Sequence, residues 1–170
     1  MVRIGLLSDT HGHIDERMIH HLKDCDEIWH AGDIGTAAVS DALAAIKPYR
    51  AVFGNIDGHE LRRMHPLEQY FELEGFTIWM THIAGKPYVY SKGIPELIKL
   101  RKPDILICGH SHILRVERDK KFNFLYMNPG AAGYHGFHKV RTMLRFNLNA
   151  GKIENMEVVE LGPRTQLMPE

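Results

Sequence analysis

Side chains that can bind metal ions follow five short apolar runs of this 170-residue chain. In chain order they are Asp9, His11, Asp33, Asn55, His82, His110 and His112. The set combines imidazole, carboxylate and carboxamide groups and contains no thiolate, which favours Mn²⁺, Fe²⁺, Ni²⁺ or Zn²⁺ as the bound ion. The residue types therefore predict a site for divalent metal ions.

The number of these side chains indicates two ions rather than one. Seven ligands are too many for one tetrahedral ion, but they suit two ions about 3.5 to 4 Å apart that share a carboxylate. Asp33 is the natural bridging group. An isolated Gly-Asp or Gly-Asn is usually only a turn, but turn chemistry does not explain four histidines placed after apolar runs. Hydrolysis of a phosphate ester is the chemistry that such a pair of ions supports.

The elements that must position these side chains can be read from hydrophobic spacing. The apolar runs are interpreted as buried strands at Val2–Leu7, Glu27–Ala31, Arg50–Phe53, Phe76–Met80 and Asp104–Cys108. Helical spacing separates the first three runs, with Ile14, Met18 and Leu22 in one segment and Val39 to Ile46, capped by Thr36, in the next. Strands that alternate with helices predict a parallel sheet, in which the loops at the carboxyl ends of the strands meet at one edge.

The second half of the chain predicts antiparallel pairs. Tyr70–Leu73 and Phe76–Met80 flank a Glu74-Gly75 turn, and Arg141–Leu148 and Ile153–Val159 flank a turn that contains Gly151. A further helix is expected between Ile94 and Lys102. These patterns predict an α/β fold with mixed sheets in one domain over residues 1–161, followed by a tail over 162–170.

Composition limits the environment and the partners. Lys plus Arg equals Asp plus Glu at 21 each, so stable binding of nucleic acid is not expected. No window approaches the roughly 20 apolar residues of a membrane span, and Val2–Leu7 is too short for a signal peptide. Two cysteines without a disulfide pattern suit a cytoplasmic protein. The expected partner is a small phosphate ester, and self-assembly into a homo-oligomer stays open.

Taken together, Asp-x-His, Gly-Asp, Gly-Asn, Thr-His and Gly-His-x-His in this order resemble the calcineurin-like metallophosphoesterases, in their small single-domain bacterial and archaeal phosphodiesterase branch. The resemblance extends from Val2 to about Lys139. It implies a four-layer α/β/β/α sandwich with two mixed sheets, and a phosphodiesterase that uses a hydroxide held between two divalent metal ions, with Mn²⁺ as the first choice. It also implies that one ion is bound by Asp9, His11 and His112, the other by Asn55, His82 and His110, and both by Asp33. Asp33, Asn55 and His82 would then act directly in catalysis.

Three positions depart from the family pattern and leave the substrate open. Ile56 follows Asn55 where larger relatives carry a histidine that serves as general acid, so Asp57, His59 and His13 stay as alternative proton donors. Ile83 stands where relatives place a glycine, and Ala131 replaces a common serine. A non-catalytic metal-binding scaffold of the same fold and a nuclease remain alternatives.

Two further histidine-containing features have both a structural and a functional interpretation. His30 lies within a predicted strand, where it either pairs with the backbone or supports a metal ligand. The segment from Tyr134 to Lys139 could line a phosphate pocket, but a polar loop would look much the same.

Overall fold

The computed structural model describes residues 1–165, which form twelve strands and four helices. One sheet contains β1 (Val2–Leu7), β2 (Glu27–His30), β3 (Tyr49–Ala51), β11 (Val140–Asn149) and β12 (Lys152–Pro163). The other contains β4 (Glu68–Leu73), β5 (Phe76–Thr81), β8 (Ile105–Ile107), β9 (Leu114–Asp119) and β10 (Phe124–Pro129). The remaining elements are the short hairpin of β6 (Gly85–Lys86) and β7 (Val89–Tyr90), and the helices α1 (Glu16–Leu22), α2 (Ala37–Ile46), α3 (His59–Met64) and α4 (Ile94–Arg101).

Both five-stranded sheets are mixed. Their strand orders are β12-β11-β1-β2-β3 and β4-β5-β8-β10-β9. Strands β1, β2 and β3 are parallel neighbours in the first sheet, and β5, β8 and β10 are parallel neighbours in the second. Antiparallel strands complete the first sheet on one side, with β11 and β12, and the second sheet on both sides, with β4 and β9. The parallel strands at the centre therefore direct their carboxyl ends toward one edge of the molecule.

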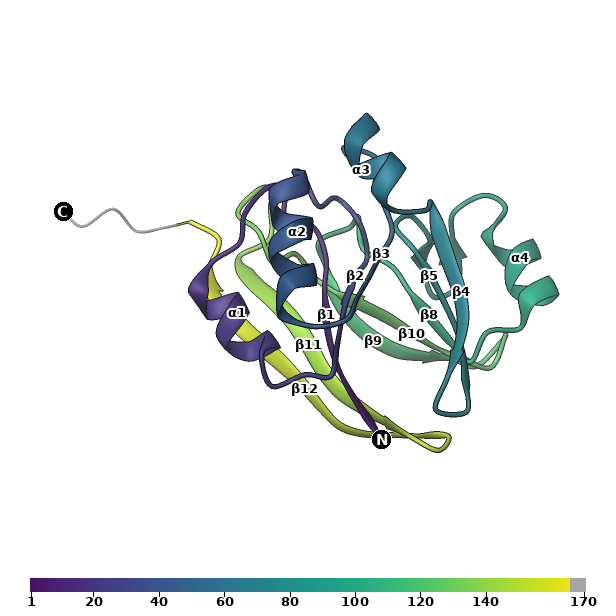
Figure 1. Ribbon diagram of the computed structural model, residues 1–170. Helices are drawn as coiled ribbons and strands as arrows, with labels where there is room; N and C mark the ends of the chain where they lie inside the picture. Colours follow the sequence, from purple (N-terminus) through teal and green to yellow (C-terminus); the bar gives the residue numbers. More distant parts are fainter. Residues whose placement is uncertain (166–170) are drawn as a thin grey trace.

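Three apolar clusters hold four layers together (Figure 1). The two sheets pack against each other through Ile4, Trp29, Ile78, Ile105 and Phe146, all of them fully buried. Helices α1 and α2 cover the outer face of the first sheet with Met18, Leu22, Val39 and Leu43. Helix α4 covers the second sheet, where Ile98 packs with Trp79 and Leu106. The expected α/β/β/α sandwich is confirmed.

Most of the predicted elements form. All five apolar runs become strands, and both hairpins lie where the turns predict them. Thr36 occupies the first position before α2, but its side chain makes no capping hydrogen bond, whereas Asp15 accepts one from the Met18 backbone amide at 2.9 Å. Of the described residues, no helix is long and apolar enough to cross a membrane.

The fold differs from the expectation at the carboxyl-terminal boundary and in elements that were not predicted. Strand β12 continues to Pro163, because Gly162 and Pro163 pair with Arg141 and Val140, so these two residues belong to the sheet and not to a tail. The last part of the expected tail, 166–170, lies outside the described residues. The sequence patterns also do not predict five elements of the structure, namely β6, β7, β9, β10 and α3.

Candidate metal centre

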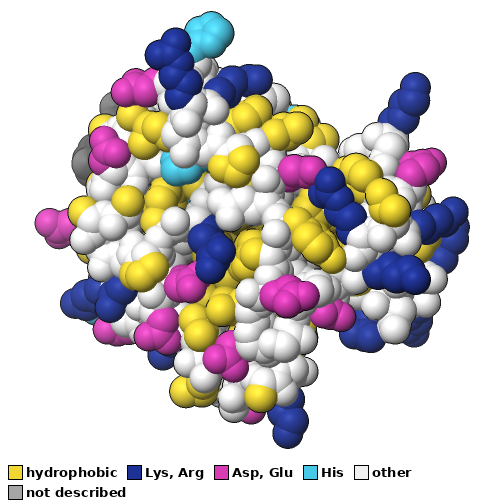
Figure 2. All heavy atoms as spheres, turned by 45° about the vertical axis from the view of Figure 1, so that its right-hand side comes forward, with side chains coloured by type: hydrophobic (Ala, Val, Ile, Leu, Met, Phe, Trp, Pro, Cys, Tyr) yellow, Lys and Arg dark blue, Asp and Glu magenta, His cyan; other side chains and the backbone are white. Residues whose placement is uncertain are grey.

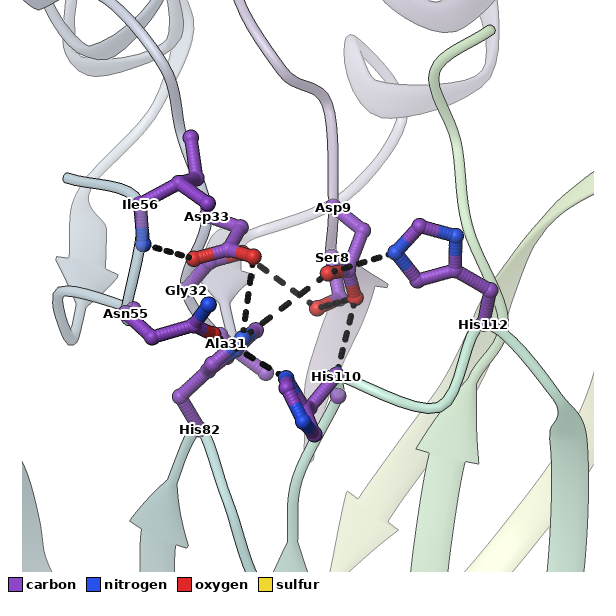
Figure 3. Close-up of polar contacts among 12 residues, drawn as sticks. Ser8, Asp9, Ala31, Gly32, Asp33, Asn55, Ile56, His82, His110 and His112 are labelled. Carbon is purple, nitrogen blue, oxygen red and sulfur yellow. Dashed lines mark hydrogen bonds and ion pairs between the residues drawn. The ribbon is translucent and has the colours of Figure 1, made fainter. Parts of the chain in front are cut away.

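The seven predicted metal-binding residues come together at the carboxyl edge of the two sheets. The ligand atoms of one group lie within 4.8 Å of one another, and those of a second group do the same; the groups are Asp9, His11 and His112, and Asp33, His82 and His110. Figure 3 shows six of the seven residues facing a common space between the loops. Residues as far apart in sequence as Asp9 and His112 thus share one site.

Asp9 is fully buried at the end of β1. Its Oδ2 accepts hydrogen bonds from the Ser8 hydroxyl at 2.6 Å and from the His110 backbone amide at 3.1 Å. Its Oδ1 lies 3.2 Å from Nε2 of His112, 3.8 Å from Nε2 of His11 and 3.9 Å from Nε2 of His82. One oxygen therefore fixes the carboxylate to the loop after β8, and the other is directed at three imidazoles.

Asp33 stands between the two groups. Its Oδ1 accepts a hydrogen bond from the Ile56 backbone amide at 3.1 Å. Its Oδ2 lies 3.2 Å from Nε2 of His82 and 3.6 Å from Nε2 of His11, which belong to different groups. A single carboxylate oxygen that approaches a histidine of each group has the position that a bridging ligand needs.

Hydrogen bonds to the remaining ring nitrogens orient two of the histidines. Nδ1 of His82 donates to the Ala31 carbonyl oxygen at 2.8 Å, so its Nε2 carries the free lone pair and faces the carboxylates. Nδ1 of His110 lies 3.0 Å from Oδ1 of Asn55, which places the Asn55 amide beside the second group. Such partners fix both the tautomer and the direction of a metal-binding imidazole.

The buried atoms that face this space lack hydrogen-bond partners. Within the described part of the chain, these atoms include Asp9 Oδ1, His11 Nε2 and His82 Nε2. Leaving a buried polar atom unpaired costs about 1 to 3 kcal/mol, so three of them in one place need an explanation. Divalent cations would pair with all three, and the oxygen and imidazole donors suit such ions. The residues therefore fit a metal site.

Backbone strain gathers at the same positions. Five of the seven residues have positive φ angles: Asp9 (54°), His11 (46°), Asp33 (55°), His110 (71°) and His112 (62°). This left-handed conformation costs a residue other than glycine roughly 1 kcal/mol or more, and strained residues of this kind cluster at functional sites. The surrounding loops hold these side chains in place against that cost.

The charges of the site suit cation binding. Burial by itself would raise the pKa of Asp9, but the neighbouring imidazoles of His11, His112 and His82 and the hydrogen bond from the Ser8 hydroxyl more than offset it and hold this pKa well below its usual range. Burial also raises the pKa of Asp33, whereas the neighbouring His82 lowers it, and the net effect is a lowered pKa. Both carboxylates are thus ionised at neutral pH, as metal coordination requires.

His30 connects the loops that carry the two aspartates. Burial lowers the pKa of His30 to about 3, so its ring is neutral. The Gly32 amide donates to Nδ1 at 3.1 Å, and Nε2 donates to the Thr10 hydroxyl at 2.9 Å, which in turn donates to the Ile34 carbonyl oxygen at 2.8 Å. His30 is therefore both a buried, backbone-paired histidine and a support for the loops of Asp9 and Asp33.

Asp57, His59 and His13, the three predicted proton donors, are not among the described residues that line the cavity at the metal centre. Asp57 is buried, and its carboxylate accepts hydrogen bonds from the backbone amides of Ile34, Gly35 and Gly54 at 2.8 to 3.1 Å. These contacts give it a structural role and argue against proton donation. His59 is exposed at the start of α3, and Nε2 of His13 lies 2.8 Å from an Asp15 carboxylate oxygen. Neither histidine lines the cavity at the metal centre.

That cavity has a volume of about 510 Å³. Four residues of the segment from Tyr134 to Lys139 line it, namely His135, Gly136, Phe137 and His138. The His135 ring stacks on His11 with the ring centroids 4.6 Å apart. The cavity is also lined by Ile56, Ser111 and Ile113, for which the sequence patterns predict no place in a substrate cavity. A hydrophobic side chain directly after a ligand, as at Ile56 and Ile113, is the signal that could have identified them.

Known proteins resemble this chain in both sequence and fold. The family model of the calcineurin-like phosphoesterase superfamily domain matches residues 2–151. A protein of Mycoplasma pneumoniae named "Probable metallophosphoesterase" is 31% identical over 165 residues, which cover 92% of this chain and 96% of that protein. The structure of an archaeal phosphodiesterase has a TM-score of 0.71 at 22% identity, covering 92% of this chain and 99% of that one. Vps29 of Entamoeba histolytica complexed with Zn²⁺ has a TM-score of 0.71 at 16% identity, covering 93% and 98% of the respective chains.

Proposed function

The chain belongs to the calcineurin-like phosphoesterase superfamily, and from this premise we propose that it is a phosphodiesterase that uses two divalent metal ions. The observation that carries the proposal is the position of Asp33, whose Oδ2 approaches His11 of one ligand group and His82 of the other. A site for one ion would not need a carboxylate between two separate groups of ligands. Mn²⁺ is our first choice of metal, with Ni²⁺, Fe²⁺ and Zn²⁺ as the other ions that this donor set accepts.

The protein's own residues have distinct roles in this proposal. When bound, two divalent ions supply an activated water molecule and stabilise the charge that develops on the phosphoryl oxygens. The first ion would be held by Asp9, His11 and His112, the second by Asn55, His82 and His110, and both by Asp33. Asn55 contributes a neutral oxygen, so the two aspartates cancel only half of the charge of two dications. The remaining positive charge attracts a phosphate ester anion.

Two observations support a diester rather than a monoester. Neither lysine nor arginine is among the residues that line the metal cavity, although a doubly charged monoester is usually bound by such groups. The archaeal structure that shares the fold is also named a phosphodiesterase. Because Ile56 cannot donate a proton, we expect the preferred substrates to have leaving groups that depart without protonation, such as nitrophenolates.

The remaining expectations about partners and location are also proposals. Both cysteines are free and buried, which suits the cytoplasm. Figure 2 shows positively and negatively charged side chains dispersed among hydrophobic groups over most of one face, which supports a small substrate rather than a nucleic acid.

Metal-reconstituted hydrolysis tests the proposal directly. Metal-free protein is loaded with Mn²⁺, Ni²⁺, Fe²⁺ or Zn²⁺ and assayed with bis(4-nitrophenyl) phosphate, 4-nitrophenyl phosphate and a short oligonucleotide. We expect the aryl diester to be hydrolysed fastest. A faster monoester would overturn the diester preference, rapid oligonucleotide cleavage would indicate a nuclease, and inactivity with every metal would favour a metal-binding scaffold.

A further inference from the structure

A second cavity adjoins the metal centre. It has a volume of about 440 Å³ and shares His110, Ser111 and Ile113 with the metal cavity. It contains none of the aspartates of the site, so it is an extension of the site rather than part of the metal-binding pocket. Its other lining residues include Ile83, Lys86, Val89, Ser91, Arg115 and Tyr126.

The β6–β7 hairpin forms one wall of this second cavity. The hairpin begins directly after Ala84, two residues beyond His82, and its strands pair Gly85 with Tyr90 and Lys86 with Val89. The Tyr126 hydroxyl donates to the Gly85 carbonyl oxygen at 2.6 Å, which fastens the hairpin to β10. Gly85 has a φ of +84°, and an added Cβ would lie 2.7 Å from the Val89 carbonyl oxygen, so the turn requires glycine. The wall is therefore built into the fold.

The lining combines apolar surface with positive charge. Ile83, Val89 and Ile113 are 41%, 64% and 65% exposed, which is a large exposure for three aliphatic side chains beside one cavity. Lys86 is exposed and forms no ion pair with any described residue. Arg115, by contrast, forms an ion pair with Glu117 at 2.6 Å, so its charge already has a partner. Lys86 is thus the main uncompensated charge at this cavity.

We propose that the second cavity binds one arm of the diester substrate, and that this arm has an apolar body and a terminal anionic group. This inference rests on the proposed phosphodiesterase function. A diester has two arms, and the two cavities meet at His110, so each cavity can take one arm while the phosphate lies at the metal-binding residues. Ile83, Val89 and Ile113 contact the body of the arm, and Lys86 pairs with its terminal carboxylate or phosphate.

Two diesters with the same leaving group test this assignment. In 4-nitrophenyl phenyl phosphate the retained arm is neutral, and in 4-nitrophenyl 4-carboxyphenyl phosphate it carries a carboxylate. Hydrolysis of either breaks the phosphorus–oxygen bond to the nitrophenyl group and forms a new one to the oxygen of water. It releases 4-nitrophenolate, gives a proton of the water to solvent, and leaves an aryl phosphate. We expect kcat/KM to be higher for the diester with the charged arm than for the diester with the neutral arm. Lys86→Met should lower the ratio of these two kcat/KM values about tenfold. That factor is on the scale of one partly exposed charge pair.

Lys92→Met is the matched control, because Lys92 is exposed nearby and does not line the second cavity. It should keep the wild-type ratio. An unchanged ratio in Lys86→Met, or no preference for the charged arm in the wild type, would overturn the assignment while leaving phosphodiesterase activity intact.

A binding measurement separates this inference from the proposed function. An uncleaved phosphonate analogue with the carboxyphenyl arm is titrated into Zn²⁺-loaded protein, and backbone amide shifts are followed by NMR. Shifts at Lys86 and Val89 support the assignment even if neither diester is hydrolysed. Absence of shifts there refutes it.

Discussion

Asp33→Asn is the substitution that most directly tests the two-ion arrangement. Asparagine has nearly the same shape and keeps an oxygen that can accept the hydrogen bond from the Ile56 amide, so the loop should retain its conformation. It removes the negative charge from the group whose Oδ2 lies 3.2 Å from Nε2 of His82 and 3.6 Å from Nε2 of His11. At about 4 Å and an effective dielectric constant of about 20, one pair of unit charges is worth roughly 4 kcal/mol.

Each ion carries two unit charges, so the expected consequence is a loss of metal affinity of at least about 10³-fold for each ion that depends on Asp33, since every 1.4 kcal/mol is a factor of ten. Bound Mn²⁺ per chain is measured by equilibrium dialysis and metal analysis, alongside turnover of bis(4-nitrophenyl) phosphate. Asp41→Asn is the matched control, because Asp41 is exposed on α2 away from the site. If Asp33→Asn still binds two ions per chain with wild-type affinity, Asp33 does not bridge them.

Three further predictions concern charge, metal removal and pH. Asn55→Asp should lower kcat for bis(4-nitrophenyl) phosphate at least about tenfold in the metal-loaded enzyme, because an added negative charge further neutralises the second ion. Removing metal with a chelator should lower the melting temperature by about 5 to 10 °C in a thermal scan, since ligand at 100 times its Kd stabilises by about 2.7 kcal/mol. Burial by itself would raise the pKa of Asp15, but hydrogen bonds from the Met18 amide, His13 and Arg141 lower it from 3.8 to about 2. A lowered carboxyl pKa stabilises the fold above about pH 4, and this contribution is lost as the pH falls toward 2. Urea denaturation should therefore find Asp15→Ala less stable by about 1 to 2 kcal/mol at pH 7, after allowance for solvent screening, with a difference that shrinks below pH 4.

The sequence predicts the parts of the fold that have strong local patterns. The five apolar runs are buried in the sheets, so their hydrophobicity is nearly continuous and easily recognised. Strand β9, Leu114–Asp119, lies at the edge of its sheet and has four charged residues among six, with no regular alternation of apolar and polar side chains. Its pairing with β10 depends on a partner that no local pattern reveals. Helix α3 has only six residues and one buried side chain, Leu61, so it offers too short a period to detect.

The same distinction separates the metal centre from the substrate site. Each metal-binding side chain directly follows a strong strand signal, so its place at the sheet edge follows from topology alone. The second cavity depends instead on the β6–β7 hairpin, whose two-residue strands give no hydrophobic period and are held by the Tyr126 hydroxyl, more than thirty residues away. The sequence shows that Ile83 departs from the family pattern. The cavity that Ile83 helps to form, however, can be recognised only from the tertiary structure. On the two proposals made above, metal chemistry in this protein would be encoded at strand ends, whereas substrate choice would depend on how a weakly patterned hairpin packs beside them.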